Sequence, residues 1–331
     1  MNSLTSYPEP SEPSAAAGDD LVSPSQAALP SDLTAIHHQL LTLLRAPSQE
    51  GAWVSLIDGV GRRIRALVER DADMALYLQV QSAQRVQDHY SSQHALFCAV
   101  VVDLCLHHLN VGDAERQSAA LATLTMNLSM MELQNELIHR ERTPTLDQRR
   151  VIDGHAQAGA QLLRQVGVQD PVWLEIVELH HTDPPPETGF AALSPTQRLA
   201  SVVRRVDVFT AKMSSRRFRA GMPATLAARA ACLGPDGRPD VVGSAVIKSL
   251  GMYPPGSYVK LASGEVAVVT RRGVKANEPV VASLVGRDGR PLAAATPRDT
   301  ADRSHAVAGI VRPAEVRGPV PPVRVGVSDR L

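Results

Sequence analysis

The stretch VIDGHAQAGAQLLRQVGV, residues 151–168, lies within a segment that predicts a helix over 145–166. It contains His155, and Gly159 follows one helical turn later. Residues four apart lie on the same face of a helix, so a glycine beside the histidine lets a second helix approach closely. We therefore expect His155 to lie where two helices meet, either as an ordinary packing contact or as part of a site.

Helical patterns extend outward from this stretch in both directions. The segment over 32–46 opens on Ser31 or Asp32, which are both good N-cap residues. Residues 52–71 carry apolar side chains at helical spacing, namely Val54, Ile57, Val60, Ile64 and Val68. Further helices are expected near 72–86, 91–109, 113–138, 170–182, 194–213 and 223–232. No alternation typical of strands interrupts this run, so the fold class of the main body is all-α.

The pattern changes at Gly251. YVKLASGEVAVVTRR (258–272), PVVASLV (279–285) and a turn at Asp288-Gly289 predict three or four short antiparallel strands. A meander of that size is marginal alone, so it should pack on the helices. The expected organisation is a disordered segment at 1–30, a helical region at 31–88, a helical domain at 89–250, a β meander at 251–291 and a disordered tail at 292–331.

Composition excludes several classes of protein. The 331 residues include 34 Lys plus Arg and 34 Asp plus Glu, so the net charge is zero and a dominant nucleic-acid surface is not expected. The three cysteines, Cys98, Cys105 and Cys232, have no CxxC spacing and are interpreted as free buried thiols in a reducing compartment. No apolar run approaches the ~20 residues of a membrane span, and the start lacks a signal-peptide pattern. We expect a soluble cytoplasmic protein.

Two further places carry candidate chemistry. His180 and His181 end the helical stretch VWLEIVELHH (172–181), and neighbouring imidazoles at such a place are candidate metal ligands. Asp207 stands inside an apolar helical run, where a buried carboxylate is costly unless it is paired or metal-bound. Its alternative partner is an arginine, either Arg204 or Arg216.

The order of these motifs resembles the HD-GYP family, a branch of the HD superfamily of metal-dependent phosphohydrolases. The likeness runs from about Tyr90 to Gly289 and is carried by YSSQHALFCAVVVDLC (90–105), the 151–168 stretch, IVELHH (176–181), RRVDVFTAKMSSRRFR (204–219) and YPPGSYVKLASGEVAVV (253–269). Members of that family have an all-α HD-domain bundle, bind two or three metal ions and open the ring of cyclic di-GMP.

The resemblance implies roles for seven residues. The implied metal ligands are His94, His155, His180, His181 and Asp207. The implied phosphate-binding cations are Arg216 and Arg219.

Departures from the family are concentrated in TLTMNLSMMELQNEL (123–137). The His-Asp pair that names the superfamily falls on Met126 and Asn127, and the family's Gly and Lys fall on Ser129 and Met130. The Gly-Tyr-Pro loop is lost after His181. A carboxylate usually bridges two ions, whereas an amide is neutral and a thioether is a poor ligand for hard ions. The retained ligands could still bind a single divalent transition ion of Fe or Mn type, whereas a full binuclear site is doubtful.

Three functions remain open from the sequence. The first is a regulatory or binding domain that recognises cyclic di-GMP, a related nucleotide or a signalling protein. The second is an active phosphodiesterase with a rebuilt metal site. The third is a structural domain in which the polar cluster pairs internally and the methionines at 126 and 130 simply fill core volume. Region 31–88 offers no chemistry, and it is a candidate dimerisation or regulatory segment.

Overall fold

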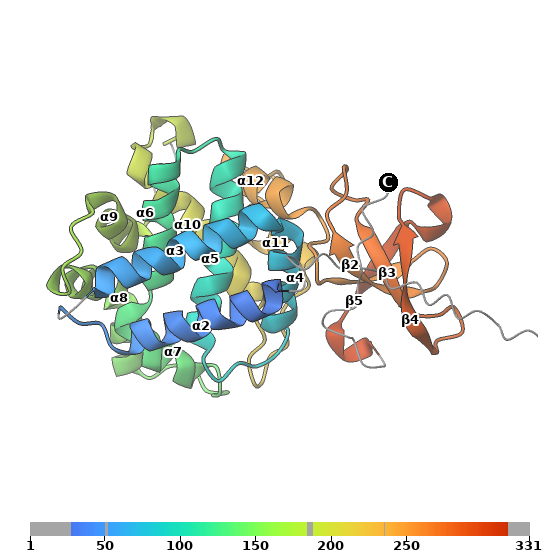
Figure 1. Ribbon diagram of the computed structural model, residues 1–331, viewed down its shortest axis with the longest axis horizontal. Coiled ribbons are helices and arrows are strands. Elements are labelled where there is room, and N and C mark those ends of the chain that lie inside the picture. Colours follow the sequence, from blue (N-terminus) through green and yellow to red (C-terminus); the bar gives the residue numbers. More distant parts are fainter. Residues whose placement is uncertain (1–27, 50–51, 184–187, 235, 317–331) are drawn as a thin grey trace, which may run out of the picture.

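A computed structural model describes residues 28–49, 52–183, 188–234 and 236–316. A helical body comes first and a small β-sheet follows it, as Figure 1 shows. The helices are α2 (Leu29–Arg45), α3 (Trp53–Arg70), α4 (Ala72–Ala83), α5 (Tyr90–His108), α6 (Asp113–Thr125), α7 (Met131–Leu137), α8 (Leu146–Gln165), α9 (Pro171–Leu179), α10 (Pro195–Met213), α11 (Ala224–Cys232) and α12 (Val241–Leu250). Short 3-10 turns are η1 (Leu128–Met130), η2 (Phe190–Ala192), η3 (Arg303–His305) and η4 (Pro313–Glu315).

Helix α5 is the centre of the body. Sixteen of its nineteen residues are buried, and it packs against α2, α3, α4, α6, α10 and α12. A helix that is apolar on every side is one that other helices surround. Helices on both sides of residue 88 contribute to this one core. The site residues carried by α5 are therefore held in the interior.

Local capping sets where the site helices begin. Thr145 and Gln148 form a reciprocal capping box at the start of α8, and Ser194 forms another with Gln197 at α10. At α9 the Asp170 carboxylate accepts from two backbone N–H groups of the first turn, at 2.9 and 3.2 Å. These caps fix the entry of the three helices that carry most of the candidate ligands.

The expected helix over 113–138 is broken. Helix α6 ends at Thr125, the backbone leaves helical geometry at Asn127, and α7 begins only after the turn η1. The Thr125 hydroxyl donates back to the carbonyl of Leu121 at 2.8 Å, a bond that tends to bend helices. The Ser129 hydroxyl donates to the carbonyl of His155 at 2.8 Å, so the turn is tied to α8. A tertiary contact thus overrides the continuous helical pattern of the sequence.

The sheet has five antiparallel strands in the order β4-β3-β2-β1-β5. They are β1 (Tyr258–Leu261), β2 (Val266–Arg271), β3 (Val280–Val285), β4 (Pro291–Asp299) and β5 (Val307–Val311). The prediction of a disordered tail over 292–331 is wrong for the described part, because β4 pairs with β3 and β5 pairs with β1. Helix α2 likewise begins at Leu29, inside the segment expected to be disordered. The rest of that segment, residues 1–27, and the end of the tail, 317–331, lie outside the described residues.

The sheet packs on α4 at its junction with the helical body. Gln81 and Gln84 both donate to the carbonyl of Gly256, at 2.6 and 3.0 Å. Tyr77 of α4 shares a buried apolar cluster with Tyr258 of β1. The prediction of an all-α body with a β appendage packed against it is confirmed.

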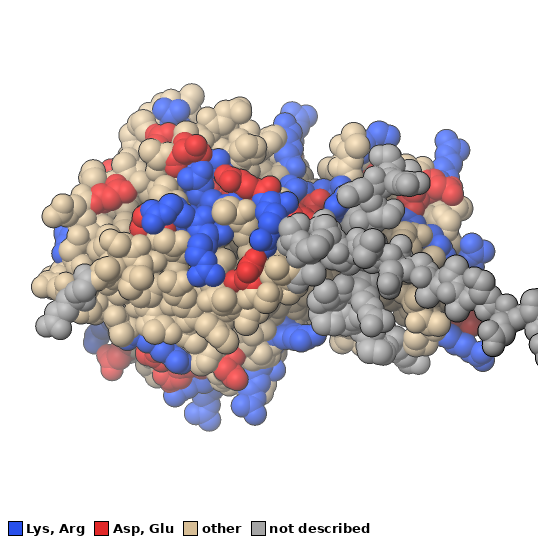
Figure 2. Space-filling view, viewed as in Figure 1, with Lys and Arg blue, Asp and Glu red and all other residues tan. Residues whose placement is uncertain are grey.

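The visible surface is mixed in charge. On the face of Figure 2, basic and acidic side chains alternate over α3. Arg62 pairs with Asp58, and Arg65 pairs with Asp113 at 2.6 Å. Among the described residues, no helix combines the length with the hydropathy that crossing a bilayer demands.

Candidate metal centre

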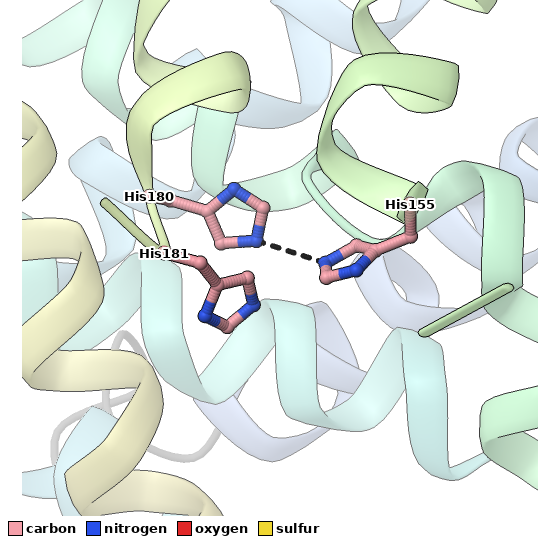
Figure 3. Close-up of side chains that lie close together, drawn as sticks. All are labelled: His155, His180 and His181. Atoms are coloured by element: carbon pink, nitrogen blue, oxygen red, sulfur yellow. Dashed lines mark hydrogen bonds between the residues drawn. The ribbon is translucent and has the colours of Figure 1, made fainter. Parts of the chain in front are cut away.

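Three histidines converge from two helices (Figure 3). His155 lies on α8, His180 is the C-cap of α9, and His181 follows it directly. The ring centroids of His155 and His181 are 4.9 Å apart, and those of the two neighbouring histidines are 4.2 Å apart. His155 and His180 are almost fully buried, whereas His181 reaches the surface. Three of the five predicted ligands thus lie together.

Gly159 lies on the face of α8 that meets the neighbouring elements. A Cβ at Gly159 would lie 3.6 Å from the carbonyl oxygen of Met126 and 3.6 Å from a methyl group of Val177 on α9. The expectation that the face around His155 meets other elements is confirmed, and they are η1 and α9. The spacing is ordinary van der Waals contact, so an alanine would also fit.

Hydrogen bonds fix the orientation of the two buried rings. Nδ1 of His180 lies 2.7 Å from the carbonyl oxygen of Val177, and Nδ1 of His155 contacts the carbonyl oxygen of Ile152 in the same way. A carbonyl oxygen only accepts, so each Nδ1 carries the proton and donates it. The Nε2 atoms are then left with lone pairs, and they face each other at 3.1 Å.

Two facing lone pairs repel each other unless a positive charge lies between them. Burial, followed by the nearby His181, lowers the pKa of His155 and lowers the pKa of His180 to about 4, so neither ring is charged near neutral pH. A proton is therefore a poor solution. A divalent cation fits, because metal-bound histidines characteristically donate their other ring N–H to a backbone carbonyl. The donor set of His155, His180 and His181 is thus suited to one borderline metal ion.

The other two predicted ligands form a separate pair. His94 of α5 lies with its Nε2 2.7 Å from Oδ1 of Asp207 on α10. Arg204, one of the alternative partners for this carboxylate, instead pairs with Asp183 at 2.6 Å. Tyr90 stacks on the imidazole of His94 with centroids 5.3 Å apart.

Electrostatics hold this pair in its charged form. Burial disfavours charge on both groups. The neighbouring Cys98 and Tyr90, and then the hydrogen bond to Asp207, nevertheless raise the pKa of His94, and the same hydrogen bond lowers the pKa of Asp207. His180 and His181 also lower the pKa of Asp207, which means that the carboxylate is within electrostatic range of the other group. The five predicted ligands therefore lie in one region, divided into two groups.

Cys98 is a candidate ligand that sequence reasoning missed. Its Sγ lies 3.6 Å from Nε2 of His94, and the sulfur, the imidazole and the Asp207 carboxylate form a second group that could hold a metal ion. The interpretation of the three cysteines as free and buried is confirmed. The overlooked signal is the spacing, because Cys98 follows His94 by four residues on the same helix.

The segment with the departures lies beside the first group. Met126 is fully buried and belongs to the apolar core, Asn127 is also buried, and Met130 is half-buried. Ser129 holds the backbone of His155, as described above. Filling of core volume is therefore confirmed for Met126, which offers no ligand suited to a hard ion.

The arginine-rich turn follows α10. Arg216 and Arg219 pair through their backbones in a tight turn, and both side chains are exposed. The guanidinium of Arg219 donates to the carbonyls of Ala211 and Ser214, at 3.2 and 3.4 Å. Partial burial, and then the positive charge of Arg216, lowers the pKa of Arg219. Two neighbouring cations of this kind favour an anionic ligand.

Comparison with known proteins gives one informative relative. No family model matches the chain, and no solved structure matches it. Over 189 residues the chain is 25% identical to the protein named cyclic di-GMP phosphodiesterase PA4108 of Pseudomonas aeruginosa. The match covers 56% of this chain and 45% of that protein, so the chain spans less than half the length of the relative. The chain is thus similar, over about half its own length, to a protein named for the hydrolysis of cyclic di-GMP.

Proposed function

We propose that this chain acts in bacterial cyclic-dinucleotide signalling as a degenerate HD-GYP domain that binds one divalent transition ion and cyclic di-GMP, or a related nucleotide, with impaired hydrolysis. His155, His180 and His181 hold the ion, and the turn with Arg216 and Arg219 contacts phosphate oxygens. The bundle is of the HD type. Similarity to a cyclic di-GMP phosphodiesterase supports the nucleotide class.

The opposed lone pairs of His155 and His180 carry this proposal. Their Nε2 atoms are 3.1 Å apart and both Nδ1 atoms are bonded to carbonyls, so the pair is ready for a cation and unfavourable without one. His181 adds a third imidazole from the exposed side. A bound ion supplies Lewis acidity toward a phosphoryl oxygen, and the three imidazoles position it.

Impaired hydrolysis follows from the missing anion. In two-metal hydrolases the ions lie about 3.5–4 Å apart and need negative ligands between them. Asn127 is a neutral amide where the resembling family has a carboxylate, and Met126 is packed into the core. The one nearby carboxylate among the predicted ligands, Asp207, is engaged with His94. The chain keeps the means to bind an ion and loses those that hold a close pair.

Calorimetry with cyclic di-GMP tests the binding function. We expect wild-type protein loaded with Mn²⁺ to give a saturable heat, and Arg216→Ala to weaken affinity at least tenfold, because a hydrogen bond to a charged group contributes about 1.5–3 kcal/mol. Arg290→Ala is the matched control, since Arg290 is an exposed arginine on the β-hairpin turn. Absence of binding by the loaded wild type, or equal weakening by both variants, would contradict the proposal.

An active phosphodiesterase is the second candidate. It is favoured by the preservation of His94 and Asp207 in electrostatic reach of the three histidines. The assay is release of linear dinucleotide by metal-loaded protein. Multiple turnover that disappears in His180→Ala and Asp207→Ala would establish this candidate, and binding without turnover would establish the first.

A further inference from the structure

A cysteine thiol completes the group around His94. Cys98 and His94 project from the same face of α5, since they are four residues apart. Sγ of Cys98 lies 3.6 Å from Nε2 and 3.9 Å from Nδ1 of His94, and 3.0 Å from Oγ1 of Thr210 on α10. Cys98 and His94 are at most 2% exposed, and the Asp207 side chain is 14% exposed.

We propose that Cys98, as a thiolate, joins His94 and Asp207 in a second metal site, selective for a thiolate-binding ion such as Zn²⁺ or Co²⁺. The proposed function concerns the three-histidine group, and this inference rests on the geometry of a different set of atoms. It holds whether or not the chain binds a nucleotide.

The distances fit a tetrahedral ion. Bond lengths of about 2.3 Å to sulfur and about 2.0 Å to nitrogen, at the tetrahedral angle, separate the two ligand atoms by about 3.5 Å. The observed separation of Sγ and Nε2 is 3.6 Å. The carboxylate oxygen is closer to Nε2, at 2.7 Å, than the roughly 3.3 Å that the same geometry requires. Asp207 is the more exposed partner, so it has room to move by about half an ångström.

Charge favours the ion as well. Binding releases two protons to solvent, one from the thiol and one from Nε2 of the charged His94, which leaves two anions, the thiolate and the carboxylate, around a divalent cation. Such a group is neutral with a neutral imidazole, whereas two buried anions without the ion would be costly. The hydroxyl of Thr210 donates to the carbonyl of Val206 at 2.8 Å. It lies close enough to the sulfur to turn its proton toward a thiolate.

Ligand type sets the choice of ion. Thiolate is a soft ligand that binds Zn²⁺ and Co²⁺ in preference to Mg²⁺ or Mn²⁺. The three-histidine group contains no sulfur, so the two groups should differ in selectivity. That difference allows each to be observed separately.

Cobalt spectroscopy provides the test. Full-length protein loaded with Co²⁺ should show a near-ultraviolet thiolate-to-cobalt charge-transfer band. Cys98→Ser should abolish the band, and His155→Ala should keep it. The matched controls are Cys105→Ser and Cys232→Ser. Both are buried, and burial raises the pKa of these thiols to about 12 and about 11, which keeps them protonated.

A second measurement needs no variant and is unaffected by folding defects. X-ray absorption of wild-type protein loaded with Zn²⁺ should show a sulfur ligand at about 2.3 Å. A zinc or cobalt protein without any sulfur ligand would overturn the proposal, as would a charge-transfer band that survives Cys98→Ser. Because nucleotide calorimetry is a separate readout, failure of this inference and failure of the proposed function remain distinguishable.

Discussion

Metal-dependent stability follows directly from the two opposed imidazoles. The variant that tests this is His155→Ala, whose thermal stability is measured with and without metal. In wild-type protein, an ion at a hundredfold excess over its Kd adds about 2.7 kcal/mol to the free energy of unfolding. For a chain of this size 1 kcal/mol corresponds to about 2–4 °C, so we expect Tm to rise by about 5–10 °C on loading.

The variant should lose nearly all of that rise. His155 is 2% exposed and supplies one of the two Nε2 atoms that meet at 3.1 Å. In chelator, truncation leaves a cavity but also removes the lone-pair repulsion. We therefore expect a cost of about 2 kcal/mol, at the low end for large-to-small changes in a core. Loading should then shift the Tm of the variant by less than about 2 °C.

Thermal unfolding in chelator and in graded Mn²⁺, an ion that a thiolate site does not favour, measures both quantities. The double variant His107→Ala/His108→Ala is the control, because it removes an adjacent pair of exposed histidines from the end of α5. That variant should keep the full rise. A wild-type Tm that is the same in chelator and in Mn²⁺ would refute the reasoning, as would a Mn²⁺-dependent rise that persists in His155→Ala.

Three further predictions concern the sheet and the altered turn. Gly256 has φ +89°, and a Cβ there would lie 2.8 Å from the carbonyl oxygen of Tyr77. Urea unfolding should therefore show that Gly256→Ala destabilises the protein by about 2 kcal/mol or more. Hydrogen bonds from Arg298 lower the pKa of Glu265 from 4.5 to about 2. The stability that the ionised carboxylate contributes is therefore complete above about pH 4.5 and is lost as the pH falls through 2. In acid titrations, Glu265→Gln should flatten this dependence of stability on pH. Asn127→Asp adds a buried anion, which should lower the Tm in chelator. Elemental analysis should show more ions bound per chain in this variant. Unchanged metal content would contradict the placement of residue 127 near the ions.

The fold could be predicted where the pattern is local. Helices such as α8 and α10 have capping boxes and amphipathic spacing in the sequence itself. The break at Asn127 depends on the bond from Ser129 to α8, which no local pattern encodes. Strand β4 contains Pro291 and Pro297 and looks like an irregular tail, yet proline is tolerated because β4 is an edge strand. Helix α12 was also unforeseen; Asp240 caps it by accepting from the Gly243 N–H at 2.7 Å.

The site could be predicted in its residues but not in its pairing. His155, His180 and His181 stand out through their motifs, and they do converge. The partner of Asp207 could not be chosen from the sequence, because His94 is 113 residues away and arginines lie closer along the chain. Packing of α5 against α10 decides the matter.

The distribution of charge indicates how the two groups work together. Two divalent ions 4 Å apart repel by about 16 kcal/mol at an effective dielectric constant of about 20, four times the value for unit charges. The anions available, Asp207 and a thiolate at Cys98, both belong to the group around His94. The three-histidine group has no anion of its own, so an ion there keeps its positive charge and favours an anionic ligand such as a nucleotide phosphate. Metal binding and nucleotide binding should therefore be positively coupled. Cyclic di-GMP should bind at least tenfold more tightly to metal-loaded protein than to chelator-treated protein. Equal affinities would show that the ion and the phosphates do not meet.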